Sequence, residues 1–245
     1  MPFEAIVDST PPKVNGEETH VVAIRSSDLP KSPKLLEPAI DMANEAFEDT
    51  YGSLATAGQK SRWAGGPAQF IQEFHPTDAV TLFITSKPSP LPFLKPRVCA
   101  MVTFEPYVGK DKATAGPTAL PVLAAEPNQK LWSVKALAVD IKCQGGGLAK
   151  WLMQQVEILT TATALADGFV SSRLVLNTIR AGHIEGFYQR MGWMTVEQTE
   201  TPAGVSVGPE GFTLLRMEKI IDLAGKAQEV ATDSMTPAED HLTTH

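Results

Sequence analysis

Residues 131–149 read LWSVKALAVDIKCQGGGLA, an apolar stretch that runs into three consecutive glycines and then opens a helix. Glycine at a strand-to-helix turn leaves main-chain N–H groups free to converge on an anion, and the helix that follows adds the positive end of its macrodipole. The alternative is a purely steric role, because a tight connection also favours glycine. The stretch therefore predicts a phosphate-bearing ligand at a strand–turn–helix junction.

The spacing of the glycines excludes two common nucleotide-binding turns. The dinucleotide fingerprint G-x-G-x-x-G, started at Gly145, requires a third glycine where Lys150 stands. The phosphate loop of NTPases requires Gly-Lys-Ser/Thr, whereas this lysine follows alanine and precedes tryptophan. What remains, Gln144-x-x-Gly147-x-Ala149, resembles the Gln/Arg-x-x-Gly-x-Gly/Ala turn of the GNAT superfamily of acyl-CoA-dependent acetyltransferases.

A second segment strengthens this resemblance. Residues 173–193 read RLVLNTIRAGHIEGFYQRMGW, which predicts a strand, a short helix and a glycine stop. Within them, Phe187-Tyr188-x-x-x-Gly192-Trp193 resembles the Phe-Tyr-x-x-x-Gly-Phe close of the GNAT fold. Two motifs in the family's order favour an acyl-CoA site over a steric turn.

The resemblance implies which residues hold acetyl-CoA, the acyl donor. The pantetheine arm would pair with the main chain of Leu137, Ala138 and Val139, and the Val139 N–H would stabilise negative charge on the carbonyl oxygen. The pyrophosphate would lie on the amides of Gln144, Gly145, Gly146, Gly147, Leu148 and Ala149. Lys150 either reaches a phosphate or lies in solvent, and Arg180 and Arg190 are candidates for the ribose phosphate.

Acyl transfer to an amine needs a proton donor for the departing thiolate and a proton acceptor for the amine. The resemblance assigns the donor to Tyr188, whose alternative is plain aromatic packing. For the base, Glu105 ends a strand near the expected substrate side, and Ser133 stands where relatives often carry a glutamate. His75 precedes a proline at a helix end and is more typical of a cap or surface group, and bulk water remains a further alternative.

The chain departs from the family pattern at two positions. The asparagine often found seven residues before the motif tyrosine is Ala181 here, with His183 close by. The turn carries Gln144 instead of the commoner arginine, which is a known variant of the motif. The first departure removes one expected cofactor contact.

Composition limits the class of protein. The 245 residues, 43% of them hydrophobic, are enough for one well-packed domain, and a net charge of −7 argues against nucleic-acid or membrane-surface binding while favouring a cationic, amine-bearing substrate. The two cysteines, Cys99 and Cys143, allow no disulfide framework and no metal site; Cys143 is a tolerated turn residue or a reactive thiolate. With no signal peptide or membrane-span pattern, we expect a soluble, cytoplasmic protein.

Periodicity predicts the order of helices and strands. We expect helices at 34–47, 65–74, from 147 onward and at 183–191, and strands at 20–25, 79–85, 97–105, 131–139, 173–179, 194–199 and 212–220. The strand at 173–179 has a continuous apolar run, LVL, which predicts burial on both faces. The resemblance implies an α/β (α+β) GNAT fold, with a mixed, mostly antiparallel sheet, splayed central parallel strands and flanking helices.

The domain boundaries follow from the segments that lack periodicity. Residues 1–18 are expected to be a flexible arm, 19–222 a single domain and 223–245 a disordered acidic tail. The segment 106–130 is either a flap over the substrate side or an exposed insertion with a helical turn around 118–125, and a proline-dense loop spans 86–96.

The leading hypothesis from sequence is an acetyl-CoA-dependent N-acetyltransferase that works by direct attack of a primary amine in a ternary complex. The alternative is a GNAT-fold module that binds acyl-CoA as a sensor or partner-binding protein without turnover. The sequence has no motif that identifies the acceptor, which is either a small molecule or a peptide. Because relatives often form dimers, a homodimer is one of the possible oligomeric states.

Overall fold

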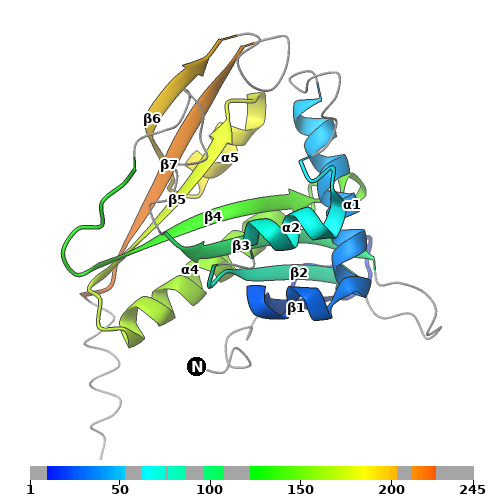
Figure 1. Ribbon diagram of the computed structural model, residues 1–245, viewed down its shortest axis with the longest axis horizontal. Helices are drawn as coiled ribbons and strands as arrows, with labels where there is room; N and C mark the ends of the chain where they lie inside the picture. Colours follow the sequence, from blue (N-terminus) through cyan, green and yellow to red (C-terminus); the bar gives the residue numbers. More distant parts are fainter. Residues whose placement is uncertain are drawn as a thin grey trace, which may run out of the picture.

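The computed structural model describes residues 10–52, 62–74, 77–86, 97–107, 122–202 and 211–224. Within them lie seven strands and the helices that flank them (Figure 1). The strands are β1 (Thr19–Arg25), β2 (Val80–Ser86), β3 (Val98–Pro106), β4 (Gln129–Val139), β5 (Ser171–Ile179), β6 (Met194–Thr201) and β7 (Phe212–Asp222). The helices are η2 (Ser26–Lys31), α1 (Pro33–Tyr51), α2 (Gly66–Phe74), η3 (Ile141–Cys143), α4 (Leu148–Ala166) and α5 (Gly182–Arg190).

The helices and strands predicted from the sequence are confirmed within a few residues. Two contacts join the described part of the predicted arm 1–18 to the domain: Val14 is buried in the core, and the Thr19 hydroxyl donates to the Pro12 carbonyl over 3.0 Å. Residues 15–18 are exposed. Burial of the apolar Val14 side chain is more favourable in free energy than its exposure to water in an extended arm. The helical turn considered around 118–125, the loop 87–96 and the tail from 225 lie mostly or wholly outside the described residues.

The sheet is mixed, with strand order β1-β2-β3-β4-β5-β7-β6. Among the described strands, β4 and β5 form the one parallel pair, and their ladder runs only from Gln129↔Ser171 to Ser133↔Val175. Beyond that point β4 continues beside β3 and β5 continues beside β7, so the two strands diverge. Figure 1 shows the result: β1 to β4 cross the view, while β5, β7 and β6 rise steeply away from them.

A β-bulge in β4 marks where the strands part. Lys135 is paired with Thr103 and Ala138 with Met101, so β4 carries one residue more than β3 across this step. Ala136 has a φ of +54°, a left-handed conformation that costs a non-glycine residue roughly 1–3 kcal/mol. A bulge bends its strand and increases the local twist. The bend therefore falls between Lys135 and Ala138, just beyond Ser133, the last residue of β4 that is paired with β5.

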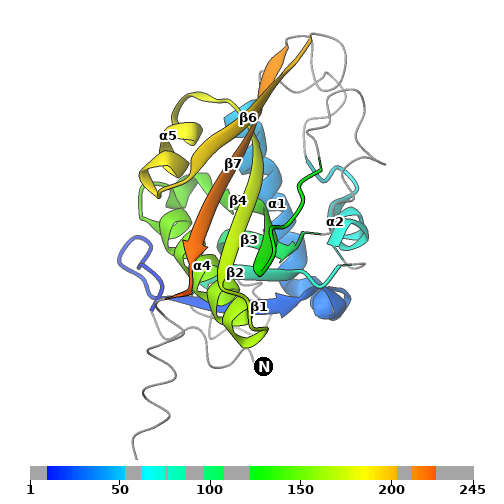
Figure 2. The same cartoon turned by 90° about the vertical axis from the view of Figure 1, so that its left-hand side faces the viewer.

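Helices cover the two faces of the sheet separately (Figure 2). The larger apolar cluster includes Leu152 and Val156 of α4 and is packed against Leu174 and Met217 of the sheet. The smaller cluster unites α1 and α2 with the opposite face of β2 and β3, and it includes the fully buried Phe70, whose ring contacts Trp63 and Phe74. Apolar residues at helical spacing on α1 and α4 explain this division, since each helix buries one stripe.

The end of β5 differs from the sequence expectation. Leu174, Val175 and Leu176 are buried as predicted, whereas Asn177 is exposed and the last two residues are half-buried. The reason is the divergence of β4, which leaves this end of β5 with a neighbouring strand on one side only. The exposed end of β5 therefore lies along the opening between the two strands.

Candidate functional site

The glycine-rich turn joins the open end of β4 to α4. Gly145 and Gly147 have φ values of +78° and +81°, which glycine adopts without strain. A Cβ atom built on either residue would meet no atom within 4 Å. Both glycines are therefore required by backbone conformation and not by crowding, and the space above them is open.

The N–H groups of this turn have no acceptor within the described part of the chain. The first main-chain bond of α4 runs from the Trp151 N–H to the Gly147 carbonyl over 2.9 Å, and the N–H groups of residues 145–150 are without a main-chain partner. No side chain caps α4, whose N-cap residue is Gly147. Unsatisfied N–H groups and the positive end of the helix dipole together form an anion site.

Asp140 anchors the start of the turn. One of its carboxylate oxygens accepts from the Lys142 N–H over 2.8 Å, and the other accepts from Nε and Nη2 of Arg97 over 3.1 and 2.8 Å. Its own N–H donates to the Cys99 carbonyl of β3 over 2.9 Å. These contacts fix the turn against β3 and leave its glycines unencumbered.

The two cysteines lie beneath this turn, and both are buried free thiols. Burial raises the pKa of Cys99 to about 12, and the neighbouring Cys143 adds to the shift. Burial, followed by the charge of Asp140, also raises the pKa of Cys143. A raised pKa keeps the Cys143 thiol neutral at pH 7, which favours the tolerated turn residue over the reactive thiolate.

The end of β4 presents main-chain groups to the opening. Leu137 and Val139 pack their side chains against the larger cluster and Ala138 against the smaller one. Because the Asp140 N–H points to β3, and successive N–H groups of a strand point to opposite edges, the Val139 N–H points away from β3. This edge of β4 is the one that β5 leaves unpaired.

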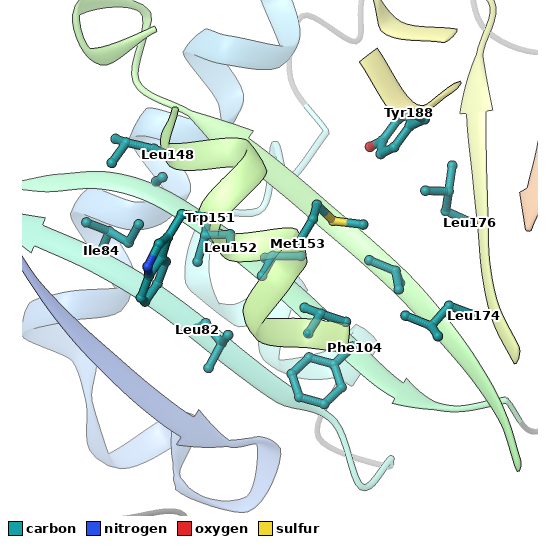
Figure 3. Close-up of a cluster of buried hydrophobic side chains, with 14 of the residues drawn as sticks. Leu82, Ile84, Phe104, Leu148, Trp151, Leu152, Met153, Leu174, Leu176 and Tyr188 are labelled. Atoms are coloured by element: carbon teal, nitrogen blue, oxygen red, sulfur yellow. The ribbon is translucent and has the colours of Figure 1, made fainter. Parts of the chain in front are cut away.

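Tyr188 of α5 lies across this opening. Its side chain is buried, with the rings of Phe187 and Trp193 at centroid distances of 5.1 and 5.9 Å. Figure 3 shows its hydroxyl oxygen directed away from Leu176 of β5. Burial, followed by the nearby Tyr51, raises the pKa of Tyr188 above its ordinary value. The hydroxyl is thus protonated at neutral pH, and within the described residues no hydrogen-bond partner is found for it.

Tyr51 connects the two halves of the splayed sheet. It ends α1, which packs on β3 and β4, yet its hydroxyl forms a 3.1 Å hydrogen bond with the Thr178 hydroxyl of β5. We expect Tyr51→Phe to lower the free energy of unfolding by about 1 kcal/mol, because one partly buried hydrogen bond is lost. The corresponding decrease in Tm is about 2–4 °C. Thermal denaturation checks this, and an unchanged Tm would mean that the bond does not hold the two halves together.

Glu105 and Ser133 lie on the opposite face of the sheet from α4. They are paired across β3 and β4, and Glu105 is buried with one carboxylate oxygen 2.6 Å from Lys135 Nζ. The other oxygen has no partner among the described residues. Lys135 Nζ lies 5.9 Å from the ring of Phe74 in α2, which places this group on the α2 side. Glu105 is therefore a buried carboxylate with one free acceptor atom.

The remaining basic side chains considered for the site differ in exposure and in whether they already have hydrogen-bond partners. Lys150 is exposed at the start of α4, and His183 is exposed on α5. Arg180 is occupied by Glu185 over 3.2 Å and by Gln198 over 2.9 Å. His75 lies outside the described residues. Within the described ranges, no cluster of His, Cys, Asp or Glu could hold a metal ion, and no helix there is long and apolar enough to cross a membrane.

A mixed sheet with one splayed parallel pair, a glycine turn at its open end and flanking helices is the GNAT fold. Two solved structures of Arabidopsis thaliana NAA60 share it: one in complex with a bisubstrate analogue (TM-score 0.51, 16% identity) and one in complex with acetyl-CoA (TM-score 0.50, 16% identity). Each comparison covers 83% of this chain, and 99% and 98% of the two NAA60 chains. No protein-family model and no curated protein matches the sequence.

Proposed function

We propose that this protein is an acetyl-CoA-dependent N-acetyltransferase. The observation that carries the proposal is the convergence of three features on one opening: the unpaired edge of β4, the uncapped glycine turn that follows it, and the buried hydroxyl of Tyr188. The complex of the similarly folded NAA60 with acetyl-CoA supports the choice of ligand.

The free groups fit the parts of coenzyme A. The unpartnered amides of Gly145, Gly146, Gly147, Leu148 and Ala149, with Gln144 beside them, offer donors for the pyrophosphate. The open edge of β4 at Leu137, Ala138 and Val139 can pair with an extended amide chain such as the pantetheine arm. Bound there, acetyl-CoA supplies an acetyl thioester. The Val139 N–H would then face the negative charge that develops on the thioester oxygen.

The two proton transfers are assigned to groups on opposite faces of the sheet. The amine forms the new C–N bond while the C–S bond breaks, and the amine proton passes to water or to the free oxygen of Glu105. Tyr188 donates its proton to the departing sulfur and regains one from solvent. Ser133, beside Glu105, can position that water. Direct transfer needs no covalent intermediate on the protein.

The test is calorimetric titration of the full chain with acetyl-CoA, followed in the same sample by thiol release against a panel of primary amines. Binding together with release from at least one amine supports the enzyme. Binding without release on any amine supports a non-catalytic acyl-CoA sensor instead. Absence of binding would contradict the assignment of the glycine turn and the proposal with it.

A further inference from the structure

Arg216 of β7 is a buried arginine, and one edge of its guanidinium group has no hydrogen-bond partner within the described residues. Its side chain is only 1% exposed, and Nη1 donates to Glu197 of β6 over 2.7 Å. Nε and Nη2 have no hydrogen-bond partner within the described residues. A charged donor that is buried without a hydrogen bond is costly in free energy. Such donors are therefore normally hydrogen-bonded to a protein atom, a water or a ligand.

The two unpartnered atoms, Nε and Nη2, are the pair by which other arginines of this chain bind carboxylates. Nε and Nη2 lie on one edge of the planar guanidinium and present two nearly parallel N–H bonds, the geometry that holds a carboxylate. Arg97 uses these two atoms on Asp140 over 3.1 and 2.8 Å. Arg173 uses them on Glu218 over 2.9 and 2.6 Å. In Arg216 the same edge is buried and has no hydrogen-bond partner within the described residues.

The strand register places Arg216 close to where β4 and β5 diverge, on the face of the sheet away from α4. It is paired with Asn177 of β5, two residues beyond Val175, where the β4–β5 ladder ends. Its neighbours in β7, Leu215 and Met217, belong to the cluster packed on α4, so the alternation of a strand turns Arg216 to the other face. Glu105, through Ser133 and Val175, shares that face.

A second buried group near Arg216 also has an atom that lacks a hydrogen-bond partner within the described residues. Glu218 follows two residues later on the same face and is 3% exposed; Arg173 holds one carboxylate oxygen, and the other has no partner among the described residues. Arg216 therefore offers N–H donors with positive charge, and Glu218 offers an acceptor with negative charge. A small molecule with both an ammonium and a carboxylate complements the two, and it leaves the net charge of the cluster unchanged.

We propose that the acceptor of this protein is an amine that also carries a carboxylate, such as an amino acid, and that the Nε/Nη2 edge of Arg216 binds this carboxylate. The inference rests on the proposed acetyl transfer. It assigns Arg216 as a specificity-determining residue, on the face opposite the glycine turn.

The first experiment compares amines in matched pairs with the unaltered full chain. Amino acids and their carboxamides are tested for thiol release from acetyl-CoA, and ethanolamine phosphate is tested against ethanolamine. We expect each amino acid to exceed its carboxamide by about 10- to 100-fold in kcat/KM, because a site built for a charged group rejects the analogue without it. The carboxamide amine is the more easily deprotonated, so amine basicity would favour the opposite order.

Variants assign the preference to Arg216. Arg216→Gln should reduce the carboxylate-to-carboxamide ratio to about one, and Arg216→Lys should leave an intermediate ratio because it keeps the charge without the fork. The ratio is independent of how much of each variant folds. Glu197→Gln is the matched control, since it retains an acceptor for Nη1 and should keep the ratio of the unaltered chain.

The outcomes separate this inference from the proposed function. Equal turnover of amino acids and carboxamides would overturn the inference while leaving the acetyltransferase intact. A preference for ethanolamine phosphate alone would also overturn it and would identify a phosphate-bearing acceptor. If acetyl-CoA does not bind, the proposed function fails, and thermal shifts with amino acids and carboxamides, with and without CoA, still test the Arg216 edge; equal shifts would contradict it.

Discussion

Gly147→Val is expected to weaken acetyl-CoA binding by about a hundredfold or more. Gly147 has a φ of +81° and is the N-cap of α4, so a β-branched residue would force the turn out of its left-handed conformation. The N–H groups of residues 145–150 would then no longer converge, and each charge-assisted hydrogen bond lost to the pyrophosphate is worth about 1.5–3 kcal/mol. Isothermal titration calorimetry with acetyl-CoA measures the effect.

Gly168→Val provides the matched control at the other end of α4. Gly168 has a φ of +79°, and like Gly147 it has no atom within 4 Å of a built Cβ. Both variants should lose similar stability, roughly 1–3 kcal/mol from backbone strain. Only Gly147→Val should lose binding. Equal affinity in the two variants would contradict the assignment of the turn, whatever their stabilities.

The layout of the fold was predictable because it depends on local periodicity. The stripe of Leu148, Leu152, Val156 and Leu159 predicts α4, and all four are buried in the structure. The place where the sheet opens was not predictable. It depends on a bulge at Ala136, which takes a left-handed conformation without the glycine that usually marks one. Tertiary pairing with β3 imposes that conformation, and no local pattern encodes it.

The candidate site was predictable in part for the same reason. The glycine turn and Tyr188 lie within short contiguous motifs, so the sequence indicates them directly. Arg216 and Glu218 alternate with apolar residues in β7, a pattern that usually indicates a solvent-facing side of a strand. The structure buries them instead, with Arg216 only 1% and Glu218 only 3% exposed. A pattern of alternation gives the face of a side chain but not what lies over it.

Tyr188→Phe is expected to reduce kcat by about a hundred- to a thousandfold, within the range for loss of a general acid. The affinity for acetyl-CoA should change little, because the phenylalanine ring keeps the contacts with Phe187 and Trp193. Tyr51→Phe is the matched control: it removes the hydroxyl of the neighbouring tyrosine and should retain kcat despite its lower Tm. Single-turnover thiol release, with calorimetry on the same samples, separates chemistry from binding.

The pH dependence adds an independent test of the same role. Because burial raises the pKa of Tyr188, its hydroxyl stays protonated well above neutral pH, and the rate should not fall between about pH 6 and 9 through ionisation of this donor. The rate should instead rise with pH as the amine loses its proton. In Tyr188→Phe the rise should persist at a lower level throughout, since the donor is absent and the amine is unchanged. Wild-type turnover in this variant would exclude Tyr188 from the mechanism and leave solvent as the proton donor to the departing sulfur.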